Sequence, residues 1–331
     1  MASKKLIVIL GATGNQGGSV AETFLRESGW RVRAISRNPL GSKAQALAAC
    51  GAEVVKADLD NPSSLLSAFE DAHVIFAVSD FWGLYGDPAN KDKATPGQPL
   101  NVWAANHETQ QLKNVIDAAA KVQSLERFVL SSLSNATKWS GGKYTHVYHF
   151  DSKAKAEIYG RENQPELWAK TSIFQAGYFL SNFVSNPITQ PRKNANGVVQ
   201  FIGGLDPNVK LPFIAAEEDS GPIVRAMVSD SARKTVIGYR DYITLRELIE
   251  VFSKVTGMKA EPVILPKGQS VVPFPPELQK ELDDNWGYWE EFGYEGRGDL
   301  TVIHPRDLER APQLSSVAEY FKKQDWSKVL G

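Results

Sequence analysis

Cysteine is nearly absent, since Cys50 is the only one among 331 residues. This excludes disulfides within the chain and zinc sites built from several cysteines, and it fits a reducing compartment. Because Cys50 follows two alanines, we expect it to be a packed small residue rather than a nucleophile.

Long apolar runs are missing as well. No stretch approaches the roughly 20 apolar residues that cross a bilayer, and the run at residues 6–10 is too short for the core of a signal peptide. The sequence therefore predicts a soluble intracellular protein without membrane attachment, located in the cytoplasm, with the nucleus left open as a second location.

Charge of one sign is not in excess, because 37 lysines and arginines face 38 aspartates and glutamates. The overall charge thus favours neither nucleic acid nor anionic lipid as a partner. No helix-turn-helix, zinc-finger or basic-stripe pattern indicates direct DNA binding. The hydrophobic share of 42% is that of an ordinary globular protein.

The first half of the chain alternates strand and helix patterns. Short β-branched apolar runs predict strands at residues 5–10, 31–36, 52–57, 73–78, 127–131 and 171–176. Helical patterns separate them at residues 19–28, 43–49, 62–70, 108–122 and 153–161. This rhythm predicts an α/β fold with a doubly wound parallel sheet of the Rossmann type.

From residue 177 the rhythm loosens and prolines become frequent. We expect residues 1–176 to form the dinucleotide-binding Rossmann domain. Residues 177–331 are expected to form mainly a smaller irregular α/β lobe for a substrate or partner, with segments that return to the Rossmann core. Helices are predicted at 244–255 and 314–326. The acidic groups at 217–219 and 283–284 are expected to be solvated charges of loops or helix starts rather than a glycosidase-like acid/base pair.

A glycine-rich loop directly follows the first predicted strand and opens the first helix. It consists of Gly11, Ala12, Thr13, Gly14, Asn15, Gln16 and Gly17. The first glycine permits a tight turn, the second lets a pyrophosphate approach the backbone, and the third lets helix and strand pack closely. The helix N-terminus would then bind the phosphates through free N–H groups.

The residue after the second strand indicates which dinucleotide is bound. An acid there would accept the ribose hydroxyls of NAD, but the sequence has Arg37 and no carboxylate before Glu53. A guanidinium suits a 2′-phosphate by charge and geometry, so NADP is predicted over NAD. The alternative is that Arg37 is a solvated surface charge.

Polar residues also follow the third and fourth strands, where ligands bind in open α/β sheets. After the third strand, an adenine ring would be flanked by Asp58 and Leu59. After the fourth strand, the middle of the cofactor would lie near Ser79, Asp80 and Phe81. Each group serves equally well as an ordinary loop cap.

The chain is similar to atypical and extended short-chain dehydrogenases. Active members of that group carry Tyr-x-x-x-Lys, in which the phenol is the acid, and a serine that orients the carbonyl. Lys153 is present here, but its i−4 partner is His149, and Tyr148 is one residue out of place. Lys153 can still hydrogen-bond the nicotinamide ribose. Ser131 or Ser132 lies where the orienting serine would be. His149 or Tyr144 could donate the proton in a variant mechanism. No histidine or cysteine spacing extends His146, His149 and Asp151 into a metal site, so none is predicted.

Further segments resemble the NmrA-like family of atypical short-chain dehydrogenases. They are residues 11–18, 36–39, 78–82, 149–153, 176–182, 206–212 and 218–222. The resemblance implies NADP contacts by the glycine loop, Arg37, Asp58, Leu59, Ser79, Asp80, Phe81, Lys153, Ala176, Gly177, Tyr178 and Phe179. It also implies a typical absence of the catalytic tyrosine.

Members of that family divide into two functional classes. Some are redox sensors that bind NAD(P) and a protein partner such as a GATA-type transcription factor. Others resemble isoflavone-reductase-like enzymes that use NADPH on small aromatic or unsaturated substrates. We favour the sensor at this stage, with the NADPH-dependent oxidoreductase as the alternative. The tract at 283–294, rich in acids and aromatics, is expected to be lobe core, with a lid or contact surface as the alternative.

Overall fold

The computed structural model describes residues 4–331, and its largest element is an eight-stranded parallel sheet with the order β14-β11-β6-β5-β4-β1-β2-β3. The strands are β1 (Lys5–Ile9), β2 (Trp30–Ser36), β3 (Glu53–Lys56), β4 (Val74–Ala77), β5 (Arg127–Ser132), β6 (Thr171–Ala176), β11 (Thr235–Gly238) and β14 (Val302–Ile303). The predicted doubly wound fold and its six strands are confirmed.

The central strands β1 and β4 are apolar and buried on both faces, which is typical of parallel strands covered by helices on either side. Ile7 of β1 is in register with Val32 of β2 on one side and Val74 of β4 on the other. The chain order reverses between β1 and β4, and a ligand crevice is expected at the carboxyl ends of strands at such a point.

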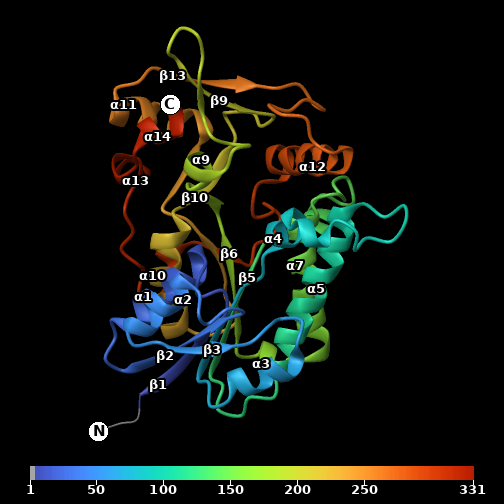
Figure 1. Cartoon of the computed structure of the whole chain (residues 1–331), viewed down its shortest axis with the longest axis vertical. Helices are drawn as coiled ribbons and strands as arrows, with labels where there is room; N and C mark the ends of the chain where they lie inside the picture. Colours follow the sequence, from blue (N-terminus) through green and yellow to red (C-terminus); the bar gives the residue numbers. More distant parts are fainter. Residues whose placement is uncertain (1–3) are drawn as a thin grey trace.

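Helices cover both faces of the sheet (Figure 1). They are α1 (Asn15–Leu25), α2 (Ser42–Ala49), α3 (Pro62–Phe69), α4 (Phe81–Gly86), α5 (Leu100–Ala119), α6 (Ala136–Trp139), α7 (Tyr148–Asn163), α8 (Pro165–Trp168), α9 (Asn182–Ser185), α10 (Ala216–Ser229), α11 (Leu245–Thr256), α12 (Pro276–Phe292), α13 (Val317–Lys322) and α14 (Trp326–Leu330). One face packs on α1 and α10, and the other on α3, α5 and α7.

The helix predictions were wrong in several places. Two long helices, α10 and α12, were missed because the prolines suggested irregular structure. Pro222 lies inside α10, whereas Pro276 occupies the first turn of α12, where its missing N–H costs nothing. Within the helix expected at 314–326, only Val317–Lys322 (α13) is helical before α14 begins at Trp326, and α7 begins five residues earlier than the predicted 153.

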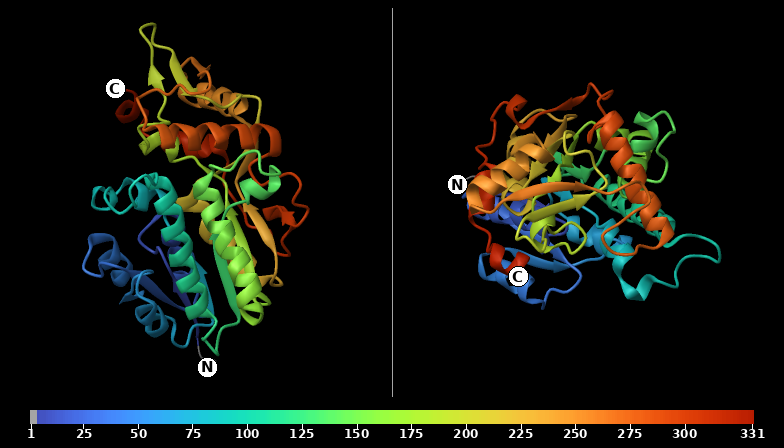
Figure 2. Two further views of the ribbon diagram at one scale, coloured as in Figure 1. Left: turned by 90° about the vertical axis from the view of Figure 1, so that its right-hand side faces the viewer. Right: turned by 90° about the horizontal axis from the view of Figure 1, so that it is seen from above.

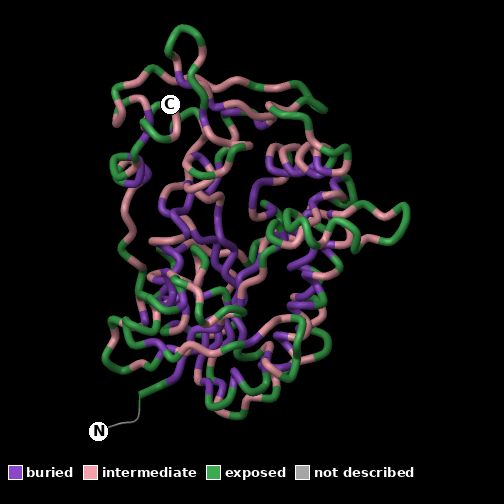
Figure 3. The backbone as a smooth tube through the Cα atoms, viewed as in Figure 1, coloured by how far each residue is buried: buried purple, intermediate pink, exposed green. Residues whose placement is uncertain are grey.

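The rest of the chain forms a lobe above the carboxyl ends of the main sheet (Figure 1). Its strands are β7 (Tyr178–Phe179), β8 (Arg192–Lys193), β9 (Val199–Gly203), β10 (Lys210–Ile214), β12 (Asp241–Thr244) and β13 (Ala260–Ile264). Its core is aromatic and includes Phe183, Phe201, Phe213 and Phe252. Figure 3 shows buried backbone in the main sheet and in this lobe. Strands β11 and β14 follow residue 177 in sequence but pair in the main sheet.

Helix α12 crosses above the upper ends of α5 and α7 (Figure 2). The contacts of Asn101 and His149 with Glu281 join it to both helices. This places α12 over the carboxyl edge of the sheet, between the Rossmann core and the lobe.

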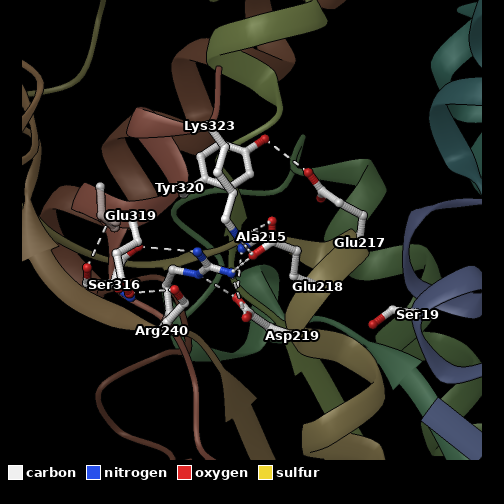
Figure 4. Close-up of polar contacts among 12 residues, drawn as sticks. Ser19, Ala215, Glu217, Glu218, Asp219, Arg240, Ser316, Glu319, Tyr320 and Lys323 are labelled. Atoms are coloured by element: carbon white, nitrogen blue, oxygen red, sulfur yellow. Dashed lines mark hydrogen bonds and ion pairs between the residues drawn. The ribbon is translucent and has the colours of Figure 1, made fainter. Parts of the chain in front are cut away.

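A buried ion cluster joins α10 to the C-terminal helices (Figure 4). The Arg240 side chain has no exposed surface, and its guanidinium binds both carboxylate oxygens of Asp219, at 2.8 and 2.7 Å. It also donates to Glu218 at 2.9 Å, and Glu218 in turn binds Lys323.

Three expectations about exposure were wrong. Asp219 and Asp284 are buried rather than solvated, because Arg240 pairs with the first and His146 with the second. Cys50 is exposed rather than packed, since it lies at the end of the surface helix α2.

Across residues 4–331, no helix is both long and apolar enough to span a membrane. In the same part of the chain, no three His, Cys, Asp or Glu side chains gather as metal ligands would.

Candidate functional site

The loop between β1 and α1 forms one wall of a cleft at the carboxyl ends of β1 to β4. Gly11 adopts a φ of 62°, which favours glycine. A Cβ atom on Gly17 would lie 2.3 Å from the carbonyl oxygen of Gly11, so a side chain there would separate helix from turn. The two glycines therefore allow the tight strand–turn–helix junction.

The N-terminus of α1 is open toward this cleft. Its cap, Gly14, offers no side chain, and its first turn carries no acid. The first N–H groups of a helix have no acceptor within it, and Asn15, Gln16 and Gly17 line the cleft. Together with the helix dipole, these groups fit a dinucleotide pyrophosphate.

Arg37 lines the same cleft from the end of β2 and is exposed. Arg31 and Arg33 of that strand pair with Glu53 instead. Asp58 and Leu59 line the cleft beyond β3, and the Asp58 carboxylate accepts the backbone N–H of Asp60 at 3.1 Å. Asp58 thus lines the cleft and also caps its own turn.

The cleft, of about 540 Å³, opens into a cavity of about 320 Å³ beneath α12. Gln16, Ser79, Asp80 and Phe179 line both spaces. A ligand that extends along the cleft past these four residues therefore reaches the cavity.

A buried carboxylate lies at this junction. Glu108 of α5 has no exposed surface and accepts the ammonium of Lys153 and the hydroxyl of Ser79, each at 2.7 Å, and the hydroxyl of Ser152. Lys153 also donates to the carbonyl oxygen of His149 at 3.3 Å. These contacts hold the ammonium of Lys153 against the cavity wall.

A second buried carboxylate orients His149. The Nδ1 atom of His149 lies 2.7 Å from Oε1 of Glu281, and Asn101 donates to Oε2 at 2.9 Å. With Nδ1–H donating to this carboxylate, Nε2 is left for the cavity that His149 lines. The ring packs 4.8 Å from that of Trp82.

Aromatic side chains form much of the remaining cavity wall, including Phe81, Tyr178 and Trp286. Burial raises the pKa of Tyr178 to about 12, although hydrogen bonds with Thr189 and Asn182 oppose this. Tyr178 is therefore a neutral phenol at physiological pH.

Comparison with known proteins identifies the family. The sequence profile described as the NmrA-like family matches residues 3–321. The chain belongs to the NmrA-like family. The NmrA-like family domain-containing oxidoreductase hkm9 of Aspergillus hancockii is 33% identical over 273 residues, which cover 78% of this chain and 75% of the relative. Its counterpart lnaB of Aspergillus flavus is 30% identical over 331 residues, covering 94% and 92%.

Solved structures share the fold. NmrA, a negative transcriptional regulator solved with NAD, has a TM-score of 0.78 and 20% identity, over 99% of this chain and 97% of that one. An NADPH-dependent quinone oxidoreductase from Escherichia coli has a TM-score of 0.63 and 21% identity, over 95% and 98%. The same fold thus occurs both in a regulator and in an oxidoreductase.

The structure brings most of the predicted NmrA-like site residues to these two connected spaces. Those lining the cleft are Gly11, Thr13, Gly14, Asn15, Gln16, Gly17, Arg37, Asp58, Leu59, Ser79, Asp80 and Phe179. Those lining the cavity include Phe81, His149, Lys153, Ala176, Gly177, Tyr178 and Phe179. Ala12 lines neither space, because it packs into the core beside the sheet.

The tyrosines near His149 lie outside the cavity-lining set. Tyr148 packs beside Phe81 and Ala104. The Tyr144 ring faces Gly287, and its hydroxyl donates to Glu291 at 2.5 Å. The geometry therefore favours His149 over Tyr144 as a proton donor.

Both candidate serines line the cavity, and their hydroxyls are already engaged. Ser131 donates to Gln16 at 2.7 Å. Ser132 donates to the carbonyl oxygen of Leu133 at 3.5 Å.

Sequence reasoning missed Glu108, Glu281 and Asn285. Glu108 has a local signal, since it lies one turn before buried Leu112 on the packed face of α5. Glu281 and Asn285 have none, because α12 itself was not predicted.

Proposed function

We propose that this protein is an NADP(H)-dependent oxidoreductase whose substrate binds in the cavity beneath α12. The observation that carries the proposal is the continuity of the cleft with that cavity at Gln16, Ser79, Asp80 and Phe179. In this proposal, residues 1–176 bind the cofactor and the later segments supply most of the substrate lobe.

The residues of the cleft fit the cofactor. The open N-terminus of α1 suits its pyrophosphate, Arg37 suits a 2′-phosphate, and Lys153 suits the nicotinamide ribose. When bound there, a nicotinamide cofactor supplies or accepts a hydride.

The side chains of the cavity supply the remaining chemistry. In its doubly protonated form, His149 gives the Nε2 proton to the substrate and returns to the neutral ring with Nδ1–H on Glu281, whose carboxylate stabilises the charged form. Lys153, held by Glu108, presents a positive charge beside the reacting group. The aromatic walls exclude water and favour an apolar, ring-bearing substrate.

The relatives support this proposal over the sensor that the sequence favoured, because hkm9 and lnaB are both named oxidoreductases. A redox-sensing regulator that binds a protein partner such as a transcription factor stays the second candidate. It is supported by the likeness to the regulator NmrA over 99% of the chain.

One experiment separates the two. Purified protein stripped of cofactor is titrated calorimetrically with NADP⁺, NADPH and NAD⁺. The NADPH complex is then screened against quinones, enones and aromatic ketones for loss of NADPH absorbance. Turnover of any compound supports the oxidoreductase, whereas redox-selective binding without turnover favours the sensor.

A further inference from the structure

A second, apolar hollow lies beside the cavity beneath α12. It measures about 80 Å³, and its walls include Phe201, Leu205 and Val263. Among residues 4–331, no charged side chain lines it. Because an apolar space offers water few hydrogen-bond partners, an apolar group is the occupant that fits this hollow.

The hollow and the cavity meet along shared side chains. Both spaces are lined by Tyr178, Ile188, Thr189, Trp286 and Trp289. A group attached to a ligand in the cavity therefore reaches the hollow past these five residues. His149 and Lys153 line the cavity but not the hollow. The reacting part of a substrate and a group in the hollow thus occupy different places.

Gly203, the last residue of β9, keeps part of the hollow open. It follows Phe201 by two residues, so a side chain at this position would lie on the same face of the strand as the buried Phe201 ring. Among the residues that the structure describes, no atom lies within 4 Å of the place where its Cβ would be. Its φ lies outside the left-handed region, so the backbone does not require glycine here. The missing side chain therefore leaves space rather than relieving strain.

The glycine that follows has a different role. A Cβ atom on Gly204 would lie 2.3 Å from Cε3 of Trp286. Gly204 therefore lets this indole pack closely against the end of β9, at the junction of the two spaces. The chain is tightly packed at Gly204 and leaves space at Gly203.

The two volumes limit what fits. A cavity of about 150 Å³ holds a benzene ring. By this measure the cavity of about 320 Å³ takes roughly two such rings, one of which is the nicotinamide ring in the proposed function. The hollow of about 80 Å³ takes about half a ring, which corresponds to an aliphatic group of about three or four carbons.

Resting on the proposed function, we propose that the substrate is a single ring that bears the reducible group and an aliphatic arm of about three or four carbons. The ring lies in the cavity with its reducible group toward His149. The arm lies in the hollow beside Gly203, which makes Gly203 a determinant of the arm that is accepted.

The test compares alkyl phenyl ketones whose arms differ in length. Acetophenone carries a methyl arm, butyrophenone a propyl arm and hexanophenone a pentyl arm. Their affinities are measured by calorimetry on the full chain saturated with NADP⁺. Each buried methylene strengthens binding by about fourfold, so butyrophenone is expected to bind about tenfold more tightly than acetophenone. Hexanophenone should gain at most about fourfold more, because the hollow is then full.

A variant at Gly203 assigns the preference to the hollow. Gly203→Val fills part of the space and is expected to reduce the preference for butyrophenone to about threefold or less, with acetophenone affinity within about twofold of the original. Because valine suits a strand better than glycine does, the variant should melt at the same or a higher temperature. Gly29→Val is the matched control. Gly29 also has open space at its Cβ position and an ordinary φ, but it lines neither the cavity nor the hollow, so the preference should stay at about tenfold.

Equal affinity for the three ketones, or no binding of any of them, overturns the proposal. The same conclusion follows if Gly203→Val keeps the full preference, because the arm then lies elsewhere. A further gain of about tenfold or more for hexanophenone also overturns it, since the hollow would not hold such an arm.

The measurement needs no turnover, so it is separate from the test of the proposed function. A length preference that Gly203→Val removes, in a protein that reduces no compound, retains the hollow as the site of an aliphatic arm and rejects only the oxidoreductase. Reduction of ketones or quinones without that preference retains the oxidoreductase and rejects the arm.

Discussion

The Nδ1 atom of His149 and the Oε1 atom of Glu281 lie 2.7 Å apart although 132 residues separate them. His149 lies in the first turn of α7 and lines the cavity, and Glu281 belongs to α12, the helix that covers the cavity. Their contact completes the site, because it fixes the imidazole tautomer and joins the Rossmann core to the lobe.

Replacing His149 tests its role in proton transfer. His149→Gln is expected to reduce kcat by about 10²–10⁴-fold, the range typical of a lost general acid. Glu281→Gln should reduce kcat less, because the imidazole remains but loses the carboxylate that stabilises its protonated form. Turnover is measured with any compound found in the NADPH screen.

The control for both variants is the affinity for NADP⁺, which should stay within about twofold of the original. Unchanged kcat in His149→Gln would remove His149 from the mechanism. A parallel loss of NADP⁺ binding would show a structural effect rather than a catalytic one.

Arg37 is expected to select the cofactor. Arg37→Ala should weaken NADP⁺ binding by about 10–100-fold, since a charge-assisted hydrogen bond contributes about 1.5–3 kcal/mol, and should change NAD⁺ binding little. Calorimetry with both nucleotides measures the ratio. Arg31→Ala, on the same strand but paired with Glu53, is the matched control. An equal loss for NADP⁺ and NAD⁺ would contradict the 2′-phosphate assignment.

The Arg240 cluster should be important for stability. Arg240→Ala leaves the buried Asp219 carboxylate without its partner, a change that typically costs about 3–5 kcal/mol. Lys323→Ala removes only a more exposed pair with Glu218 and should cost under about 1 kcal/mol. Urea denaturation measures the free energy of unfolding of both variants. Equal losses of stability would show that the buried pair of Arg240 and Asp219 contributes no more than the exposed pair.

Much of the cofactor cleft was predictable from local patterns. Each strand pattern marks its own carboxyl end, and a parallel sheet brings those ends to one edge, which is why the glycine loop, Arg37 and Ser79 meet there. The spacing of His149 and Lys153 was also readable, because four residues on a helix place two side chains on one face.

The cavity was less predictable, because its far wall comes from α12. Prolines near residue 275 and the glycine at 287 weaken the helical pattern of that segment. In the structure, Gly287 is explained by the Tyr144 ring packed against it, a contact between distant segments. Glu281 and Asn285 acquire their roles only through such contacts, which no local pattern reports.

Glu157 should make stability depend on pH. Burial raises the pKa of Glu157 from the ordinary 4.5 to about 7, while Ser132 and Arg161 oppose the shift. Between these two pH values the folded chain binds more protons than the unfolded chain, so the free energy of unfolding falls as pH rises from about 4.5 to about 7. Glu157→Gln removes the ionisable group, so the variant should gain stability relative to the original protein at pH 8 compared with pH 4.5. Urea denaturation at both pH values measures this difference.

Glu162→Gln, at an exposed position of the same helix, is the control. It should change the free energy of unfolding by the same amount at both pH values. A Glu157→Gln effect that does not change with pH would show that Glu157 ionises equally easily in the folded and unfolded chains.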